Sequence, residues 1–388
     1  CRRGWGEILC GYHGYSGALS LAERGVVAVE CVVPTSNNGF INRMRRTVRL
    51  SLVLILLAAP AIIVAQCANS AAGTAADALA TKFDTHQFVL IGSTHGDEKI
   101  ETFLRCLISR PAFKQRATDI VVEWASSNPT NQRLIDRYVL NLEEVRADDL
   151  TPIWFDTDYP IMWATLPQVR QFLDALREVN KMLPAAKRIR LVGGNDPTDW
   201  SKVKVTEDLA PYPFKTNFMQ HLLIEHIAKI PGNKTLVVYG DAHIRLQRST
   251  FMGEVEMTVG RANLYIVGRI GELRPDERAY LTAAGGDPNK PFFVDARQFP
   301  TNLPWPGSLK VNLEEKSARL ADYIDGFVYL GPEQDRDLTG SIPLSEAQKQ
   351  ELARRNSINS DPQRSMRARF QHRDQWFRAH PNDVPARP

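Results

Sequence analysis

Cysteine is scarce in this sequence of 388 residues, which contains only five. Of these, Cys67 and Cys106 follow the first methionine, Met44, and no two cysteines have the CxxC spacing. That spacing is typical of zinc ribbons and thioredoxin-like redox sites, so the sequence supports neither. Cys106 lies on the apolar face of IETFLRCLISR, and we expect it to be a small buried hydrophobic side chain.

Motifs of several common enzyme and ligand sites are missing as well. No GxSxG occurs, so the usual nucleophile elbow of α/β-hydrolases is absent. Neither GxxxxGK[ST] nor GxGxxG links an expected strand to a helix, which argues against a phosphate-binding loop. His221 and His226 are five residues apart, unlike the histidines of HExxH, and predict no zinc site. The net charge is only +4, and basic residues are not interleaved with aromatic ones, so we expect no nucleic-acid partner.

One long apolar run is present near the N-terminus. MRRTVR begins at Met44 and is followed by LSLVLILLAAPAIIVA at residues 50–65. A basic start, an apolar centre and small residues at its end predict a signal peptide at residues 44–66, cleaved near Gln66. The alternative is a membrane anchor, although the run is short for a span of about 20 residues. We therefore expect an exported protein, periplasmic or secreted, in contact with the membrane only if this segment stays attached, and residues 1–43 to be a non-native upstream extension.

The remainder of the sequence predicts one large domain between a linker and a tail. Residues 67–84 are small and low in complexity and are expected to be a linker. Residues 85–338 alternate between short apolar runs and segments of helical periodicity. Residues 339–388 are polar and rich in arginine, and they predict a surface helix followed by a loose basic tail.

The alternation within the central domain predicts its fold. The expected strands are 86–92, 118–124, 188–196, 234–243, 263–271, 291–296 and 325–331. The expected helices are 100–113, 131–145, 166–183 and 216–230. Strands that are apolar throughout and alternate with helices are typical of a parallel sheet covered on both faces. We predict an α/β fold with a mostly parallel central sheet flanked by helices, a single large domain and a polar C-terminal extension.

Ionisable side chains end four of the expected strands. They are His95 in GSTH, Glu123 in VVEW, Asp196 in GGND, and Asp241 and His243 in GDAH. Because ligands bind outside the carboxyl ends of the strands in open parallel sheets, we expect these side chains to share one edge. Each also has a structural interpretation: Glu123 could pair with Arg133 or Arg137, Asp196 could form a turn and Asp241 could cap a helix.

Two of these strand ends share the pattern Gly-x-x-His. The glycines are Gly92, three residues before His95, and Gly240, three residues before His243. A residue without Cβ allows a sharp turn or a close approach by a ligand where the chain leaves the sheet. We interpret the two copies as halves of one site.

These motifs resemble those of a superfamily that contains erythromycin esterases, ChaN-like haem-binding proteins and TraB/Tiki proteins. Its members share two GxxH motifs and a glutamate on the second strand, which here would be GSTH, GDAH and VVEW. Relatives often have GExH as the first motif, whereas Ser93 stands at that position here, and Asp97 or Glu98 could substitute for the acid. Relatives also often have an arginine at the start of the helix before the second motif, where this chain has Lys215, which keeps the charge without the planar fork.

The resemblance implies a site, for which our leading hypothesis is an exported hydrolase of an ester or peptide. His95 would act as general base toward water, Glu123 would orient an imidazole, and His243 would polarise the substrate carbonyl or act as second base. These three side chains could instead hold a divalent metal such as zinc or manganese. The further candidate binding residues are Asp196, Asp241, Gly92, Gly240 and Lys215.

Two alternatives remain open. One is a ChaN-like protein that binds haem, with Tyr239 or His243 as the axial ligand. The other is a non-catalytic interaction protein.

Overall fold

The structure is a computed structural model whose described residues all belong to one compact unit, Ile62–Pro388. The described residues are 70–93, 96–158, 165–244, 251–270, 286–296, 324–331 and 343–371, with single residues 67, 160, 163, 275, 278, 279, 282, 376, 378 and 379. The expected upstream extension and signal peptide, residues 1–66, lie outside them, as does His95. Within the described part of the chain, no helix is long and apolar enough to cross a membrane.

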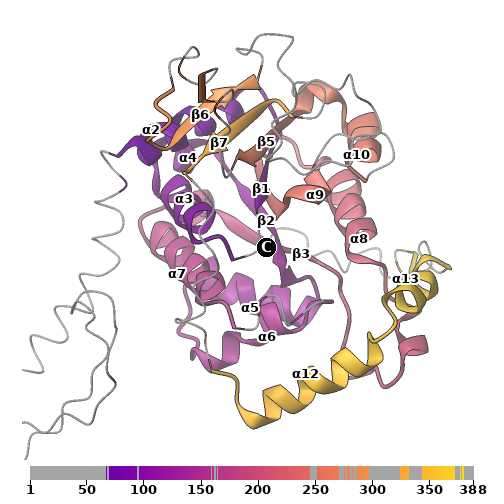
Figure 1. The fold of residues 1–388 in the computed structure, drawn as a ribbon. Helices are drawn as coiled ribbons and strands as arrows, with labels where there is room; N and C mark the ends of the chain where they lie inside the picture. Colours follow the sequence, from indigo (N-terminus) through magenta and orange to yellow (C-terminus); the bar gives the residue numbers. More distant parts are fainter. Residues whose placement is uncertain are drawn as a thin grey trace, which may run out of the picture. The chain divides into compact units, whose positions relative to one another are not determined.

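Seven strands of the described chain form one sheet at the centre of the domain (Figure 1). They are β1 (Phe88–Ser93), β2 (Asp119–Ser126), β3 (Arg190–Asn195), β4 (Thr235–Gly240), β5 (Leu264–Ile270), β6 (Phe292–Asp295) and β7 (Gly326–Tyr329). Their order in the sheet is β3-β2-β4-β1-β5-β7-β6. Every neighbouring pair is parallel except β6 and β7, which are antiparallel. The predicted mostly parallel α/β fold is confirmed.

Helices connect and cover these strands. The α-helices are α2 (Ala71–Ala80), α3 (Glu98–Ser109), α4 (Pro111–Arg116), α5 (Pro129–Val139), α6 (Pro152–Phe155), α7 (Pro167–Lys181), α8 (Lys215–His221), α9 (Asp241–Ile244), α10 (Phe251–Val259), α12 (Glu346–Ile358) and α13 (Pro362–Gln371). A π-helix, η6 (Leu222–Ile227), continues α8. Short 3₁₀ turns are η1 (Thr81–Asp84), η2 (Asp148–Leu150), η4 (Ala185–Lys187), η5 (Thr206–Leu209) and η7 (Arg261–Asn263).

Several helices begin at local sequence signals. Proline stands in the first turn of α4, α5, α6 and α7, where its missing N–H would have had no helical partner. Asp97 caps α3 by accepting a hydrogen bond from the amide of Lys99 at 3.0 Å. Ser345 and Gln348 form a capping box at the start of α12.

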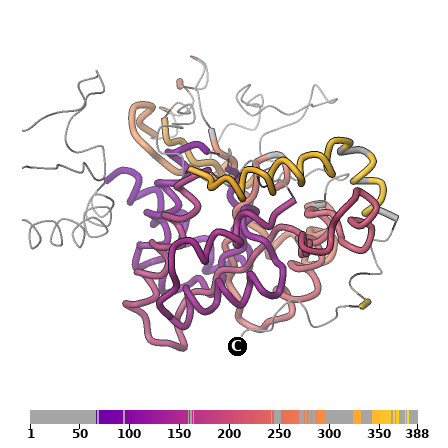
Figure 2. Tube along the Cα trace, turned by 90° about the horizontal axis from the view of Figure 1, so that it is seen from below, coloured from indigo at the N-terminus to yellow at the C-terminus, as the bar shows by residue number. Residues whose placement is uncertain are grey.

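The two faces of the sheet form two separate apolar cores. Val89 and Ile91 of β1 pack with α2, α3, α5 and α7, whereas Phe88 and Leu90 pack with α8, η6 and α10. This alternation follows from the two-residue period of a strand. Figure 1 shows α3, α5 and α7 on one side of the sheet and α8, α9 and α10 on the other, and Figure 2 shows the same division from below. Each buried aliphatic or aromatic side chain contributes about 1.5–3 kcal/mol to folding.

The segment expected as a linker differs from that expectation, because it is folded into the first core. Residues 71–84 form α2 and η1, and Ala76, Leu79 and Phe83 are buried against α3 and α4. Small residues suggested low complexity, but alanine is also the strongest helix former and allows close packing. Gly73 makes such an approach, since a Cβ there would overlap the carbonyl oxygen of Cys67.

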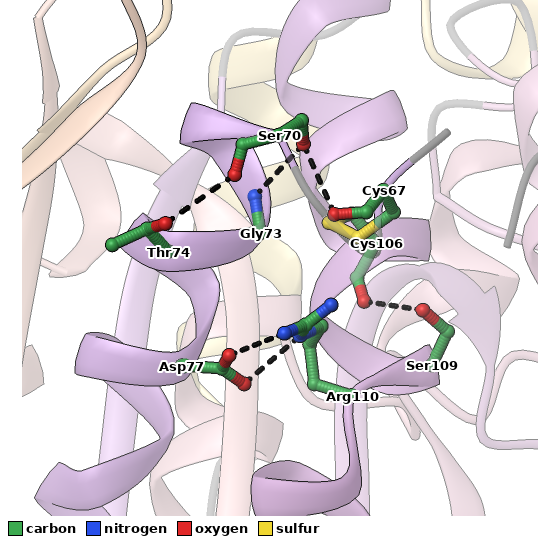
Figure 3. The surroundings of a disulfide bond; sticks show 8 residues. All are labelled: Cys67, Ser70, Gly73, Thr74, Asp77, Cys106, Ser109 and Arg110. Atoms are coloured by element: carbon green, nitrogen blue, oxygen red, sulfur yellow. Dashed lines mark hydrogen bonds and ion pairs between the residues drawn. A yellow bond between two sulfur atoms is a disulfide. The ribbon is translucent and has the colours of Figure 1, made fainter. Parts of the chain in front are cut away.

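A disulfide between Cys67 and Cys106 fixes the start of this segment to α3 (Figure 3). Cys106 is buried as expected, but its thiol is bonded, so the prediction of a simple apolar side chain is wrong. Beside the disulfide, Arg110 donates from Nε to Asp77 Oδ1 at 2.9 Å, and Ser109 Oγ donates to the Cys106 carbonyl at 2.7 Å. The bond closes a loop of the chain with a sequence separation of 39 residues.

The C-terminal segment is also part of the folded unit in its described portion. Residues 343–371 contain α12 and α13, of which α12 lies below α6 in Figure 1 and α13 continues toward the lower end of α8. Arg355, Ile358 and Arg369 are buried there. The expected surface helix is present, but the expectation of a loose tail does not hold for these residues, because Arg355 and Arg369 have buried partners.

Candidate functional site

Glu123 lies at the carboxyl end of β2, where regular pairing with β3 stops. The β2–β3 register shifts between Val122 and Ser126, so Glu123 lies in an irregular part of the strand pairing. Its Oε2 accepts a hydrogen bond from the amide of Gly240 at 2.7 Å, and its backbone carbonyl accepts one from Asn195 Nδ2 at 2.9 Å. These bonds tie the ends of β2, β3 and β4 together around one carboxylate.

Lys215 is the ion-pair partner of that carboxylate. Its Nζ lies 2.7 Å from Glu123 Oε1 and 3.9 Å from Asp158 Oδ2, and its side chain is 16% exposed. Burial by itself lowers the pKa of Lys215, but Asp158 and Glu123 outweigh this and raise it above its ordinary value. The ammonium is therefore charged, and it forms an ion pair with the Glu123 carboxyl group. Neither Arg133 nor Arg137 pairs with Glu123: Arg133 donates to Thr130 and Arg137 to Glu143.

His243 lies on the open side of this pair, in the short helix α9 that follows β4. Its Nε2 is 3.7 Å from Glu123 Oε1, and its side chain is 28% exposed, against 2% for Glu123. Burial lowers the pKa of His243, Glu123 acts in the opposite direction, and Lys215 lowers the pKa further. A neutral imidazole next to an ionised carboxylate can accept a proton and have the resulting charge stabilised.

Asp196 lies behind the pair, at the end of β3, and is fully buried. Its Oδ2 forms an ion pair with Arg369 of α13, and its Oδ1 accepts a hydrogen bond from the amide of Thr198 at 3.1 Å. The turn predicted at Asp196 is present, and the same side chain also holds a buried cation. The amides of Asp196 and Asp158 both donate to Asn195 Oδ1 at 3.0 Å, which brings the two acids together.

Sequence reasoning did not identify Asp158 and Arg369. Asp158 belongs to no strand end, and Arg369 comes from the segment expected to be a tail. Asp158 Oδ1 is buried and has no hydrogen-bond partner among the described residues. Burial raises the pKa of Asp158, against the effect of Lys215, which lowers it. The only sequence signal for Arg369 was the high arginine content of the C-terminal segment.

The two motif glycines lie beside the site. Gly240 supplies the amide that holds Glu123. At Gly92, a Cβ would overlap Asp241 Oδ1 and lie 3.1 Å from Asp241 Cα, so β1 needs a glycine for α9 to pass this close. Asp241 is the first residue of α9 and packs on β1. The first motif's His95 lies outside the described residues, whereas Ser93, two residues before it, pairs in register with Gly240.

Asp97 and Glu98, the two acids that could substitute for the one missing at Ser93, both have partners in the described structure. Asp97 caps α3 and accepts a hydrogen bond from Arg269 Nε at 3.1 Å, with both side chains buried. Glu98 accepts from Arg105 at 2.9 Å and from Gln168 at 2.7 Å. Both carboxylates have structural partners away from Glu123.

The described residues alone do not complete the expected metal set, because His95, one of its three ligands, lies outside them. They contain no group of three or more histidine, cysteine, aspartate or glutamate side chains that could hold an ion. Of the expected ligands, Glu123 and His243 are described, but Glu123 already has the Lys215 ammonium on one oxygen and the Gly240 amide on the other. A metal would have to compete with a charged lysine at that carboxylate.

Tyr239 does not fit as a haem ligand. Its hydroxyl donates to the carbonyl of Gly194 and is completely buried. Burial raises the pKa of Tyr239 well above its ordinary value, so the phenolate that iron prefers is disfavoured. His243, neutral and partly exposed, has the properties of an axial ligand.

No protein-family model matches the chain, and no curated protein sequence matches it. Several solved structures are similar at low identity. A Bacillus cereus protein is 14% identical, with 65% of this chain and 90% of that chain covered and a TM-score of 0.42. A succinoglycan biosynthesis protein is 13% identical, with 66% and 91% covered and a TM-score of 0.45. ChaN of Campylobacter jejuni, described with cofacial haem binding, is 14% identical, with 51% and 87% covered and a TM-score of 0.34. Because these TM-scores lie below 0.5, the function has to be argued from the residues of the site.

Proposed function

We propose that this protein is an exported hydrolase of an ester or peptide substrate, with His243 as general base toward water. The observation that carries the proposal is the partly exposed imidazole of His243, whose Nε2 lies 3.7 Å from Glu123 Oε1. Burial lowers the pKa of this histidine, so it is neutral and able to accept a proton near pH 7.

The reaction follows from these groups. The imidazole takes a proton from the attacking water as its oxygen bonds to the carbonyl carbon, and later returns that proton to the leaving group. Glu123 stabilises the imidazolium between these steps. Lys215 holds the Glu123 carboxyl group in place through the 2.7 Å contact. His95, which the sequence predicted as the general base, exchanges roles with His243 in this proposal, and it is expected to polarise the carbonyl.

A panel of esters and peptides tests this proposal, with and without added divalent ions. We expect His243→Ala to lower turnover by about 10²- to 10⁴-fold, the usual range for loss of a general base. His95→Ala should also lower it. The control is His221→Ala, because His221 lies in α8 and packs on His226, 5.2 Å away between ring centres. Turnover in His243→Ala equal to that of the control would reject the assignment.

Haem binding is a second candidate, because a neutral and partly exposed His243 also suits an axial ligand. Titration of the purified protein with haemin should then shift the Soret band, and His243→Ala should abolish the shift. A wild-type protein without any Soret shift would eliminate this candidate.

Export is part of the proposal, and the disulfide supports it. Bonds such as Cys67–Cys106 persist mainly in oxidising compartments. Mass spectrometry of the exported protein should find a mature N-terminus near Gln66 and no thiol at Cys106 available to alkylation before reduction. A chain that retains residues 44–65 would contradict cleavage.

A further inference from the structure

The described C-terminal residues contact the candidate site from two sides. We call α12, α13 and Trp376 the C-terminal clasp. From α12, Arg355 donates to the Phe155 carbonyl at 2.7 Å and to Asp156 Oδ1 at 2.9 Å. Asn359 Nδ2 donates to the carbonyl of Asp158 at 3.3 Å. The clasp therefore holds the loop that presents Asp158 to Lys215.

From α13, the clasp reaches the start of α8, where Lys215 is the first residue. Arg369 NH1 pairs with Asp196 and lies 3.5 Å from the carbonyl of Pro213, two residues before Lys215. Trp376 packs edge-on against Phe218, three residues after Lys215, with ring centres 5.7 Å apart. Contacts on both sides of Lys215 thus come from a segment more than a hundred residues away in the sequence.

Without Arg369, one cation of this region would face three carboxylates. Three carboxylates, Glu123, Asp158 and Asp196, face two cations, Lys215 and Arg369. The side chains of Arg369 and Asp196 are 2% and 0% exposed, so water does not screen them. The Lys215 ammonium now lies 2.7 Å from Glu123 and 3.9 Å from Asp158. If Arg369 were absent, Asp158 and Asp196 would both attract this ammonium away from Glu123.

We propose that Arg369 is a positioning residue of the candidate site: by neutralising Asp196 and holding the chain at Pro213, it keeps the Lys215 ammonium on Glu123. The clasp is then a functional part of the site. The catalytic consequence rests on the proposed hydrolase function, because Glu123 acts there through His243. The contact between Lys215 and Glu123 does not depend on that function, so it can be tested without any substrate.

The test is the NMR signal of the Lys215 ammonium in the full chain at fixed pH. A lysine ammonium in a buried ion pair is shielded from water, so its protons exchange slowly enough to be observed. We expect this signal in the wild type and its loss in Lys215→Met, which assigns it. Arg369→Met should shift or remove it. The control is Arg364→Gln on the same helix, because Arg364 pairs with Glu207 at the surface, and it should leave the signal unchanged.

Two further variants separate charge from folding. Arg369→Met/Asp196→Asn removes both charges of the buried pair, so it should restore the Lys215 signal, and Arg369→Lys should largely retain it. Both remain informative if Arg369→Met alone does not fold. A folded Arg369→Met protein with the wild-type signal, or a double variant that fails to restore it, would overturn the proposal. If the signal responds as expected but no substrate is turned over, the contact stands and the hydrolase function fails.

Discussion

Two buried ion pairs lie at opposite ends of the sheet, and they are built differently. At the amino end of β3, Arg190 binds Asp136 of α5 through two contacts, Nε to Oδ1 at 3.1 Å and NH2 to Oδ2 at 2.9 Å. Gln132 donates to the same carboxylate at 3.1 Å. At the carboxyl end, Lys215 and Glu123 share one contact of 2.7 Å.

The two sites differ in how completely their charges and their hydrogen-bonding atoms are matched by partners. Arg190 and Asp136 are joined by two contacts of the planar guanidinium fork, an arrangement that favours a fixed structure. At the carboxyl end three carboxylates face two cations, and Asp158 Oδ1 has no hydrogen-bond partner among the described residues. Burial raises the pKa of Asp158 and lowers that of His243. A group held this way can gain or lose a proton at low cost, which is the property a catalytic site requires.

The largest expected effect tests this contrast directly. Arg190→Met leaves Asp136 buried without its cation and should lower the free energy of unfolding by about 3–5 kcal/mol. Lys215→Met should cost less, about 1–3 kcal/mol, because Asp158 and His243 can take up protons as the charge changes. Urea unfolding of both variants at pH 7 measures the two costs. Equal losses in the free energy of unfolding would show that the charged groups at the carboxyl end adjust no more easily than the pair at the amino end.

The next effect concerns Glu101, a buried acid of α3. Burial raises the pKa of Glu101 from 4.5 to about 7, with Arg105 lowering it and Glu98 and Asp97 raising it. Because the folded state holds the proton more tightly, this group's contribution to stability is lost as pH rises from 4.5 through about 7. The loss amounts to about 3 kcal/mol.

Glu101→Gln should remove that part of the pH dependence. Urea unfolding at pH 4.5 and pH 8 should show a smaller fall in stability for the variant than for the wild type. Glu346→Gln, an exposed change on α12, serves as the control. Parallel curves for Glu101→Gln and wild type would mean that this acid titrates alike in the folded and unfolded states.

The features that the sequence predicted correctly are those that follow from regular strands and their ends. Strands such as β1 and β4 are largely apolar runs with a glycine at or next to their last residue, so their positions and parallel arrangement follow from period and composition alone. Glu123 and Asp196 were found because the carboxyl ends of parallel strands share an edge. These are regular consequences of the fold, and they need no knowledge of contacts between distant segments.

The partners of those residues could not be predicted in this way. Lys215 was noted only from the resemblance, and nothing in the sequence pairs it with Glu123 across 92 positions. Asp158 and Arg369 lie in an irregular loop and a polar helix, where composition indicates exposure. The alanine-rich α2 was taken for a linker for the same reason. Burial in these segments depends on tertiary contacts, which local periodicity does not encode.

The smallest expected effect compares two glycines: Gly92, which lies beside the site, and Gly232, where an added Cβ would meet open space. In Gly92→Ala the new Cβ would lie 3.1 Å from Asp241 Cα and overlap its carboxylate, so α9 must move. Overpacking of this sort costs about 1–3 kcal/mol. Gly232 has a φ of +74° and no heavy atom within 4 Å of the new Cβ, so Gly232→Ala adds only backbone strain of about 1 kcal/mol.

Because α9 carries His243, Gly92→Ala should lower turnover or haem binding by much more than its loss in thermal stability implies. Gly232→Ala should leave turnover and haem binding nearly unchanged. Equal functional losses in the two variants would place His243 outside the working site and remove the distinction between the two ends of the sheet.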